Sequence, residues 1–189
     1  MKILAIDTTL STFTAVLVNG ENTLSKSFEV GKSGHSSLIL PTIQSLMNEG
    51  GVSPQELDAV GVVVGPGSFT GIRIGVSAIT AMAFGTGAKR IAVNSFELLA
   101  YSRTKATLAI DAGHGHHYVA ECVDGQIVST DFVEAKDIDK VEGAITTTIC
   151  SRDEVLDKIV RQKWDQGDFV PVFEPFYMRK SQAERNHEI

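Results

Sequence analysis

Three glycines and a proline stand between two apolar segments and limit what this chain can fold into. The stretch Gly65-Pro66-Gly67-Ser68-Phe69-Thr70-Gly71-Ile72-Arg73 follows an uncharged run, Ala59–Val64, that is rich in β-branched residues. Such a run is typical of a strand buried on both faces. Residues 72–84 are long enough for three or more helical turns. We therefore predict a strand, a tight turn and a helix, whose first N–H groups suit an anion or close contact with another chain.

Two phosphate-binding motifs can be tested against this stretch, and neither fits. The Walker A loop needs a lysine after its last glycine, but Gly71 is followed by Ile72. The dinucleotide fingerprint needs an acid after the next strand, and that strand, Ile91–Val93, ends at Asn94. The alternative that stays open is a turn whose glycines only allow unusual backbone angles.

The chain also repeats itself. Ile3–Asp7 reads ILAID and Thr107–Asp111 reads TLAID, at an offset of 104 residues. A hairpin signal follows each copy, Asn19-Gly20 in the first and Asp124-Gly125 in the second, and a third strand follows each hairpin. We interpret this as a duplicated unit of three strands with helices. Only 85 residues remain for the second copy, so it must be shortened.

The remaining pattern predicts further helices and strands. A helix over Ser36–Asn48 would carry Pro41 in its first turns or be kinked there. Three capping boxes predict where further helices begin: Ser53/Glu56, Asn94/Glu97 and Ser151/Glu154. Two apolar runs near the end of the chain, 144–150 and Phe169–Phe173, predict strands.

Composition excludes several classes of protein. The 189 residues fit one domain or two small ones, and 43% hydrophobic residues supply a core. The net charge of −6 disfavours binding nucleic acid alone. Cys122 and Cys150 fit neither a metal spacing nor a disulfide framework. Because Met1 leads directly into a strand and no apolar stretch is expected to reach about 18 residues, we expect a cytoplasmic protein outside the membrane.

The helix after the glycine-rich turn has no wide polar face. Such a helix must be covered on more than one side. Gly71, Gly75 and Ala78 are small enough to admit a second helix closely, so we expect a partner there; the alternative is a wholly internal helix. Arg73, the one early charge, would either form an ion pair across that interface or extend to water.

Taken together, these motifs closely resemble the bacterial TsaB family, also called YeaZ. The resemblance covers nearly the whole chain and rests on five segments: Ile3–Thr8, His35-Ser36 with Leu40-Pro41, Gly65–Gly75, Ile110–Ala112 and Pro175–Arg179. It implies the duplicated actin-like, RNase H-like (ASKHA) α/β fold with a trimmed second half. The expected units are residues 1–104, carrying the partner-binding helices, and residues 105–189. The loop Gly113–His117 departs from the family pattern, which often has arginine and polar residues after the second Asp-Ala.

The same resemblance implies a function. TsaB proteins are non-catalytic scaffolds that act with TsaD and TsaE to form N6-threonylcarbamoyladenosine beside the anticodon of tRNAs that read ANN codons. ATP and a metal are expected on those partners and not tightly on this chain, and tRNA is expected to bind only through the complex. The chain alone should form a homodimer through the first two helices. The expected contact residues on those helices are His35, Ile39, Ile43, Leu46, Thr70, Ile72, Arg73, Val76 and Ile79.

An enzyme is the alternative function. A small ATPase could use a cleft between Asp7 and Asp111, with candidate phosphate contacts at Asp7, Thr8, Thr9 and Asp111, although two acids repel phosphate unless a cation bridges them. A peptidase could use Ser68, but this serine directly follows Gly67 and does not fit the nucleophile elbow; a helix cap explains it better.

Metal binding by this chain is not expected. The histidines have no pair four residues apart on a helix, and His114, His116 and His117 lie in and after a turn where alternate side chains point to opposite faces.

Overall fold

The computed structural model describes residues 1–30, 35–141, 145–146 and 151–178. The first half forms a five-stranded sheet in the order β3-β2-β1-β4-β5. Its strands are β1 (Lys2–Asp7), β2 (Thr12–Asn19), β3 (Asn22–Glu29), β4 (Ala59–Gly65) and β5 (Lys89–Asn94). The first three strands form the predicted antiparallel meander, and β4 and β5 add in parallel. Every residue of β4 is buried, which confirms the prediction from its sequence.

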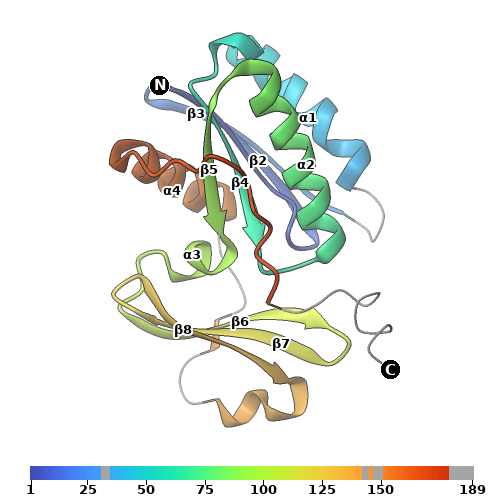
Figure 1. The fold of residues 1–189 in the computed structure, drawn as a ribbon, viewed down its shortest axis with the longest axis vertical. Coiled ribbons are helices and arrows are strands. Elements are labelled where there is room, and N and C mark those ends of the chain that lie inside the picture. The colour runs from blue at the N-terminus through green and yellow to red at the C-terminus, as the bar shows by residue number, and fades with distance from the viewer. Residues whose placement is uncertain (31–34, 142–144, 147–150, 179–189) are drawn as a thin grey trace.

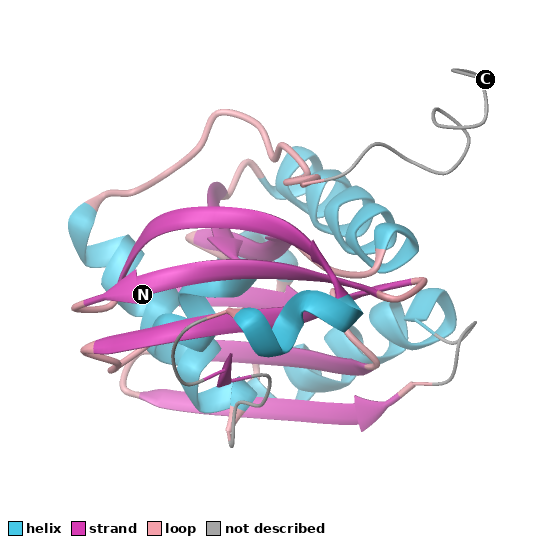
Figure 2. Ribbon diagram, turned by 90° about the horizontal axis from the view of Figure 1, so that it is seen from below, coloured by secondary structure: helices cyan, strands magenta, loops and turns pink. Residues whose placement is uncertain are grey.

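A second sheet repeats this plan in a shorter form. Its order is β8-β7-β6-β9. The strands are β6 (Lys105–Gly113), β7 (His116–Val123), β8 (Gln126–Glu134) and β9 (Ile145–Thr146). Strands β6 to β8 form a second meander and β9 lies parallel to β6, so the predicted duplication is confirmed. The 3₁₀ helix η2 (Ala135–Lys140) contacts β7 and β8 (Figure 2). The rest of the strand predicted at 144–150 lies outside the described residues.

Helices cover both faces of the first sheet (Figure 1). Helices α1 (His35–Gly50) and α2 (Phe69–Thr86) pack on one face, with the short 3₁₀ helix η1 (Pro54–Glu56) between α1 and β4. Helix α4 (Arg152–Gln166) packs on the other face through Leu156, Ile159 and Val160. Although α4 follows the second meander in sequence, it packs against the first sheet. Helix α3 (Ser95–Ala100) lies between the sheets and supplies Phe96 and Leu99 to a third core with β6 and β7.

Strand alternation decides where the candidate acid lies. Leu4 and Ile6 of β1 point into the core beneath α1 and α2, whereas Ile3 and Ala5 point into the core beneath α4. Because successive side chains alternate between faces, Asp7 falls on the side of α4. The end of β1 is therefore placed next to the start of α4.

Two local predictions fail. Residues 169–173 are not a strand: Val170 N–H donates to Arg90 O at 2.9 Å, but Pro171 has no N–H with which to continue a ladder. Helix α4 does begin at Arg152, as the Ser151/Glu154 pattern predicts, but the predicted cap fails: the Ser151 side chain forms no capping hydrogen bond. Its ψ of 78° departs from the extended backbone of Asn94, ψ 142°, whose side chain does cap α3.

The expectation that no apolar stretch reaches about 18 residues is also wrong. Helix α2 has 18 residues and a mean hydropathy of 1.2, so by length and composition alone it could cross a membrane. In this structure Ile72, Ile79 and Ala83 of α2 belong to the core under the first sheet. Helix α2 thus packs one side on the first sheet and leaves its other side exposed.

Candidate functional site

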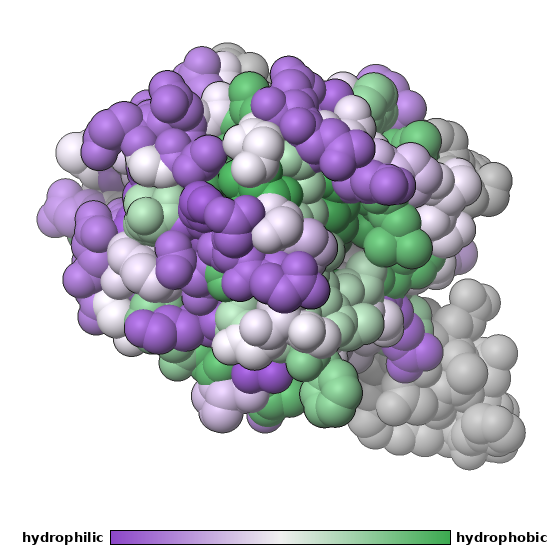
Figure 3. All heavy atoms as spheres, turned by 90° about the horizontal axis from the view of Figure 1, so that it is seen from above, coloured by the Kyte–Doolittle hydropathy of each residue, from purple (hydrophilic) through white to green (hydrophobic). Residues whose placement is uncertain are grey.

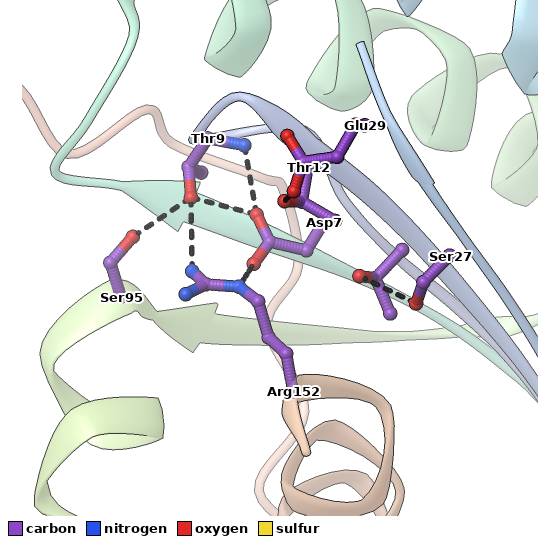
Figure 4. A network of polar contacts seen from close by, with 8 residues as sticks. Asp7, Thr9, Thr12, Ser27, Glu29, Ser95 and Arg152 are labelled. Atoms are coloured by element: carbon purple, nitrogen blue, oxygen red, sulfur yellow. Dashed lines mark hydrogen bonds and ion pairs between the residues drawn. The ribbon is translucent and has the colours of Figure 1, made fainter. Parts of the chain in front are cut away.

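The carboxylate of Asp7 lies at the centre of a buried polar junction (Figure 4). Its side chain is fully buried. Oδ1 accepts hydrogen bonds from the Thr9 N–H at 2.8 Å and from the Thr9 hydroxyl at 2.7 Å. Oδ2 is ion-paired with Nε of Arg152, which begins α4. Both carboxylate oxygens of Asp7 are therefore bonded within the chain.

Neighbouring groups tie this junction to three helices. The Arg152 Nη2 and the Ser95 hydroxyl each lie 3.4 Å from Thr9 Oγ1, so α3 and α4 meet at one hydroxyl. The Thr8 hydroxyl donates to the Gly71 carbonyl of α2 at 2.7 Å. Thr8 and Thr9 are both fully buried. Because a buried charge is costly unless it is paired and hydrogen-bonded, this junction holds β1, α2, α3 and α4 together.

The glycines of α2 have a use that differs from the prediction. A Cβ at Gly71 would collide with the Thr8 carbonyl oxygen, and one at Gly75 would collide with the Thr8 hydroxyl. Both glycines therefore admit the end of β1 and not a second helix from a partner. The expectation that they form a small-residue contact surface is wrong, because the turn after β1 already occupies that space.

Asp111 holds the position in the second repeat that Asp7 holds in the first, but it lies two residues before the end of β6, and its surroundings differ. Its side chain is exposed, and Oδ1 accepts from the Gly113 N–H at 2.7 Å. Both acids thus bond a backbone N–H two residues later, as in turns that Asp residues commonly stabilise. Only Asp7 has a cationic partner among the described residues. Arg152 is the residue that sequence reasoning missed, because 145 positions separate it from Asp7.

Ser68 and the histidine-rich turn show no catalytic arrangement. The Ser68 hydroxyl accepts from the Gly71 N–H at 3.2 Å, which confirms its prediction as the cap of α2. The His116 ring stacks on Phe132 with centroids 4.8 Å apart. His117 Nδ1 is buried and has no hydrogen-bond partner in the part of the chain that the structure describes. Across the described ranges, no group of three or more His, Cys, Asp or Glu side chains could hold a metal.

The predicted contact residues of α1 and α2 are mostly internal. Six of them are buried in the core of the chain itself: Ile39, Ile43, Leu46, Ile72, Val76 and Ile79. Thr70 and Arg73 are exposed, and nothing is described for the side chain of His35. The helical spacing of these six residues marks the side of each helix that packs on this chain's own sheet, and a partner contact through the nine residues stays a prediction.

The outer face of these helices carries different apolar groups. Phe84 of α2 is 88% exposed and Leu40 of α1 is 66% exposed. Only 28% of α2 is buried. Figure 3 shows apolar areas between hydrophilic ones on the molecule seen from above. We call the exposed residues of α1 and α2 the α1–α2 face.

Arg73 stands on this face in an aromatic setting. Its guanidinium carbon lies 4.0 Å from the centre of the Phe69 ring and 5.9 Å from that of Tyr177. Its Nε donates to the Tyr177 hydroxyl at 3.1 Å. Within the described ranges Arg73 has no acidic partner, and Phe69 and Tyr177 hold its exposed side chain in place.

A polar cleft of about 600 Å³ lies between α3, α4 and the turn from β7 to β8. Lys163 lines it and contacts Asp168 at 2.8 Å and Glu97 at 3.2 Å. Burial lowers the pKa of Lys163, but its bonds to Asp168 and Glu97 outweigh burial, and the net shift is upward. Lys163 is thus a cation that links α3 to the end of α4.

Two duplicated meander sheets, with the acid of the first repeat at their junction, define an actin-like, RNase H-like α/β protein. The fold matches two crystal structures from Pseudomonas aeruginosa. One is an uncharacterized protein with similarity to peptidase YEAZ, at a TM-score of 0.80 and 22% identity over 94% of this chain and 99% of that one. The other is YeaZ, at a TM-score of 0.74 and 21% identity over 92% and 99%.

Sequence comparison then narrows the class. The family model "TsaD: tRNA N6-adenosine threonylcarbamoyltransferase" matches residues 29–152. TsaB of Escherichia coli is 35% identical over 64% of this chain and 54% of its own length. TsaB of Bacillus subtilis is 37% identical over 53% and 44%, and that of Haemophilus influenzae 27% over 84% and 68%. The chain therefore belongs to this family and, within it, to the TsaB (YeaZ) proteins. It spans about half the length of the first two of these relatives.

Proposed function

We propose that this chain is a non-catalytic subunit in the biosynthesis of threonylcarbamoyladenosine in tRNA, and that it binds a TsaD-type transferase through the α1–α2 face. The curated relatives are named as tRNA threonylcarbamoyladenosine biosynthesis proteins, which supports the process. The exposed Phe84 and Leu40 support the contact surface, because apolar groups of this size on a helix face favour a protein partner.

One observation carries the non-catalytic part of the proposal. An ATPase working from Asp7 would need this carboxylate to hold a cation that bridges to phosphate. In this chain Arg152 and Thr9 already use both oxygens of Asp7. Asp111, the second acid of the alternative, is exposed and bonds its own turn. The chain's own residues thus fill the place that the enzyme alternative requires.

The rest of the proposal follows from the resemblance. A TsaE-type ATPase completes the complex, ATP and the metal bind to the partner proteins, and tRNA is bound through the assembly. The chain alone pairs with itself through the same face, and the whole process takes place in the cytoplasm. The polar residues at the end of β1 serve the fold of this chain and not a reaction.

The test is complex formation measured by light scattering after size exclusion, with the TsaD-type protein of the same organism. Val76 is buried, so a charge there would test folding; Phe84→Glu places the charge on the exposed face instead. The matched control is Val128→Glu, at a residue of β8 that is 57% exposed. We expect wild type and Val128→Glu to bind the TsaD-type protein, and Phe84→Glu to remain folded without binding.

Activity assays decide between the proposal and its alternative. ATP hydrolysis and peptide hydrolysis by the pure chain should both equal the background of Asp7→Asn and Ser68→Ala variants. Turnover that disappears with either variant would contradict the non-catalytic assignment. Binding that is unaffected by Phe84→Glu would contradict the contact surface.

A further inference from the structure

We infer that Arg73 is a prearranged receptor for a carboxylate of the partner protein, and that it makes the α1–α2 face favour an acidic partner over a second copy of this chain. The inference rests on the proposed function, since it concerns the same face. It adds the chemistry that the partner must present there.

The guanidinium of Arg73 is held on its flat side and at one edge. The Phe69 ring lies 4.0 Å beneath it, and the Tyr177 hydroxyl accepts its Nε–H at 3.1 Å. The rings of Phe69 and Tyr177 are 4.7 Å apart, so the two aromatics also support each other. Arginine stacks well on aromatic rings because its planar cation is weakly hydrated.

Tyr177 is in turn held by the segment that returns from α4, residues 168–178. The Phe176 N–H donates to the Val64 carbonyl at 2.8 Å, and Phe173 is buried in the core beneath α2. The position of Arg73 is therefore determined by two segments more than one hundred residues apart. A side chain ordered in advance loses less entropy when a ligand binds.

This arrangement leaves the two Nη atoms of the Arg73 guanidinium free to donate hydrogen bonds. Among the described residues, the two Nη atoms of Arg73 have no hydrogen-bond partner, and Arg73 has no ion pair, although Glu174 lies on the same returning segment. Paired N–H groups in this geometry match the two oxygens of a carboxylate. Arg73 is exposed, so an incoming group can reach it.

Charge on the face argues against a second copy as the preferred occupant. Helix α2 contains no acid, and the only acid of α1, Glu49, is paired with Lys26 at 3.1 Å. A two-fold dimer brings the same surface to both sides of the contact. Each Arg73 would then face helices that offer no unpaired carboxylate. A different protein with an Asp or Glu opposite Arg73 would supply the carboxylate that a second copy lacks.

The same observations favour a protein carboxylate over an RNA phosphate. Arg73 is the only Lys or Arg in α1 and α2, whereas phosphate backbones are bound by several cations together. The net charge of the chain, −6, also opposes approach to RNA. The surroundings of Arg73 are aromatic and apolar, as at the centre of protein interfaces.

The experiment is calorimetric titration of the TsaD-type protein with wild type, Arg73→Gln, Arg73→Lys and Tyr177→Phe. Lys105→Gln, which removes an exposed cation from β6, is the matched control for charge. We expect Arg73→Gln to weaken binding at least tenfold, Arg73→Lys to recover only part, and Tyr177→Phe to weaken it less. Lys105→Gln should match wild type. In sedimentation experiments, the dissociation constant for self-association of Arg73→Gln should differ from that of wild type by less than twofold.

Each other result contradicts a defined part of the inference. Equal loss of self-association and partner binding in Arg73→Gln removes the preference for an acidic partner. Unchanged partner binding in that variant removes the receptor itself. A loss of affinity for a tRNA transcript without loss of protein binding assigns Arg73 to phosphate and overturns the inference. If Phe84→Glu and wild type both fail to bind the TsaD-type protein, the proposed function fails and the inference fails with it.

Discussion

Asp7 and Asp111 hold equivalent positions in strands β1 and β6 of the two repeats, but their surroundings in the structure differ. Asp7 is fully buried and bonded to Thr9 and Arg152, whereas Asp111 is exposed and, within the described part of the chain, its side chain accepts a hydrogen bond only from the Gly113 N–H. The strand residues up to each acid are nearly the same, ILAID and TLAID, but the turn after Asp7 is Thr8-Thr9 and the turn after Asp111 is Ala112-Gly113. The difference therefore arises from the turn residues and from what packs against each turn. Helix α4 returns to the first sheet and brings Arg152 to Asp7. The comparison teaches that a repeated acid need not keep a repeated role.

The turns behind the two acids differ in the same way. Thr8 packs against Gly71 and Gly75 of α2, where a Cβ on either glycine would collide with it. A Cβ added to Gly113, two residues after Asp111, would have no atom within 4 Å. One turn is thus enclosed by helices and the other is open. Four predictions test this contrast, in order of decreasing effect.

Arg152→Ala should destabilise the chain by about 3–5 kcal/mol, because it leaves a buried carboxylate without its cation. The measurement is urea unfolding followed by circular dichroism. The double variant Asp7→Asn/Arg152→Met should lose less unfolding free energy than Arg152→Ala alone, since it removes both charges. If the single variant unfolds like wild type, the junction at Asp7 does not stabilise the first half as described.

Gly71→Ala should cost about 2–4 kcal/mol, since the new methyl meets the Thr8 backbone carbonyl and the helix must shift. Gly85→Ala is the control on the same helix, with open space around the added carbon. It should stabilise by roughly 0.5–1 kcal/mol through helix propensity. The same unfolding assay measures both, and equal effects would show that the turn after β1 is not enclosed.

Asp111→Asn should change stability by less than about 0.5 kcal/mol, as for most exposed sites. Its amide oxygen can still accept the Gly113 N–H bond. A loss above about 2 kcal/mol in thermal unfolding would place Asp111 in a network like that of Asp7. The contrast between the repeats would then no longer hold.

The opposite end of β1 offers an exposed ion pair for comparison with the buried one. A hydrogen bond from Lys2, at 2.6 Å, and two from Ser53 lower the pKa of Glu56 from 4.5 to about 2. A lowered pKa in the folded state stabilises above pH 4.5, and that contribution is lost as pH falls toward 2. Glu56→Gln should show a smaller fall in melting temperature between pH 5 and pH 2.5 than wild type. Because Glu56 is exposed, the effect should be the smallest of the four.

Sequence alone determined the features that depend on near neighbours. The strand of Ala59–Val64, the two meanders and the caps of Ser68 and Asn94 were all predicted, because periodicity and capping act within a few residues. The family was also accessible from its motifs. Helical spacing likewise identified an apolar side of α1 and α2, but it could not tell a core from a partner.

Only the tertiary structure decided which distant groups meet. Arg152 reaches Asp7 across 145 residues, Tyr177 reaches Arg73 across 104, and Thr8 fills the space beside Gly71. The return of α4 and of residues 168–178 to the first sheet brings the first two pairs together. Such contacts depend on the packing of whole elements, and no local periodicity encodes them. This is why the sequence identified Asp7 and Arg73 as candidate functional residues, whereas only the tertiary structure shows which side chains they contact.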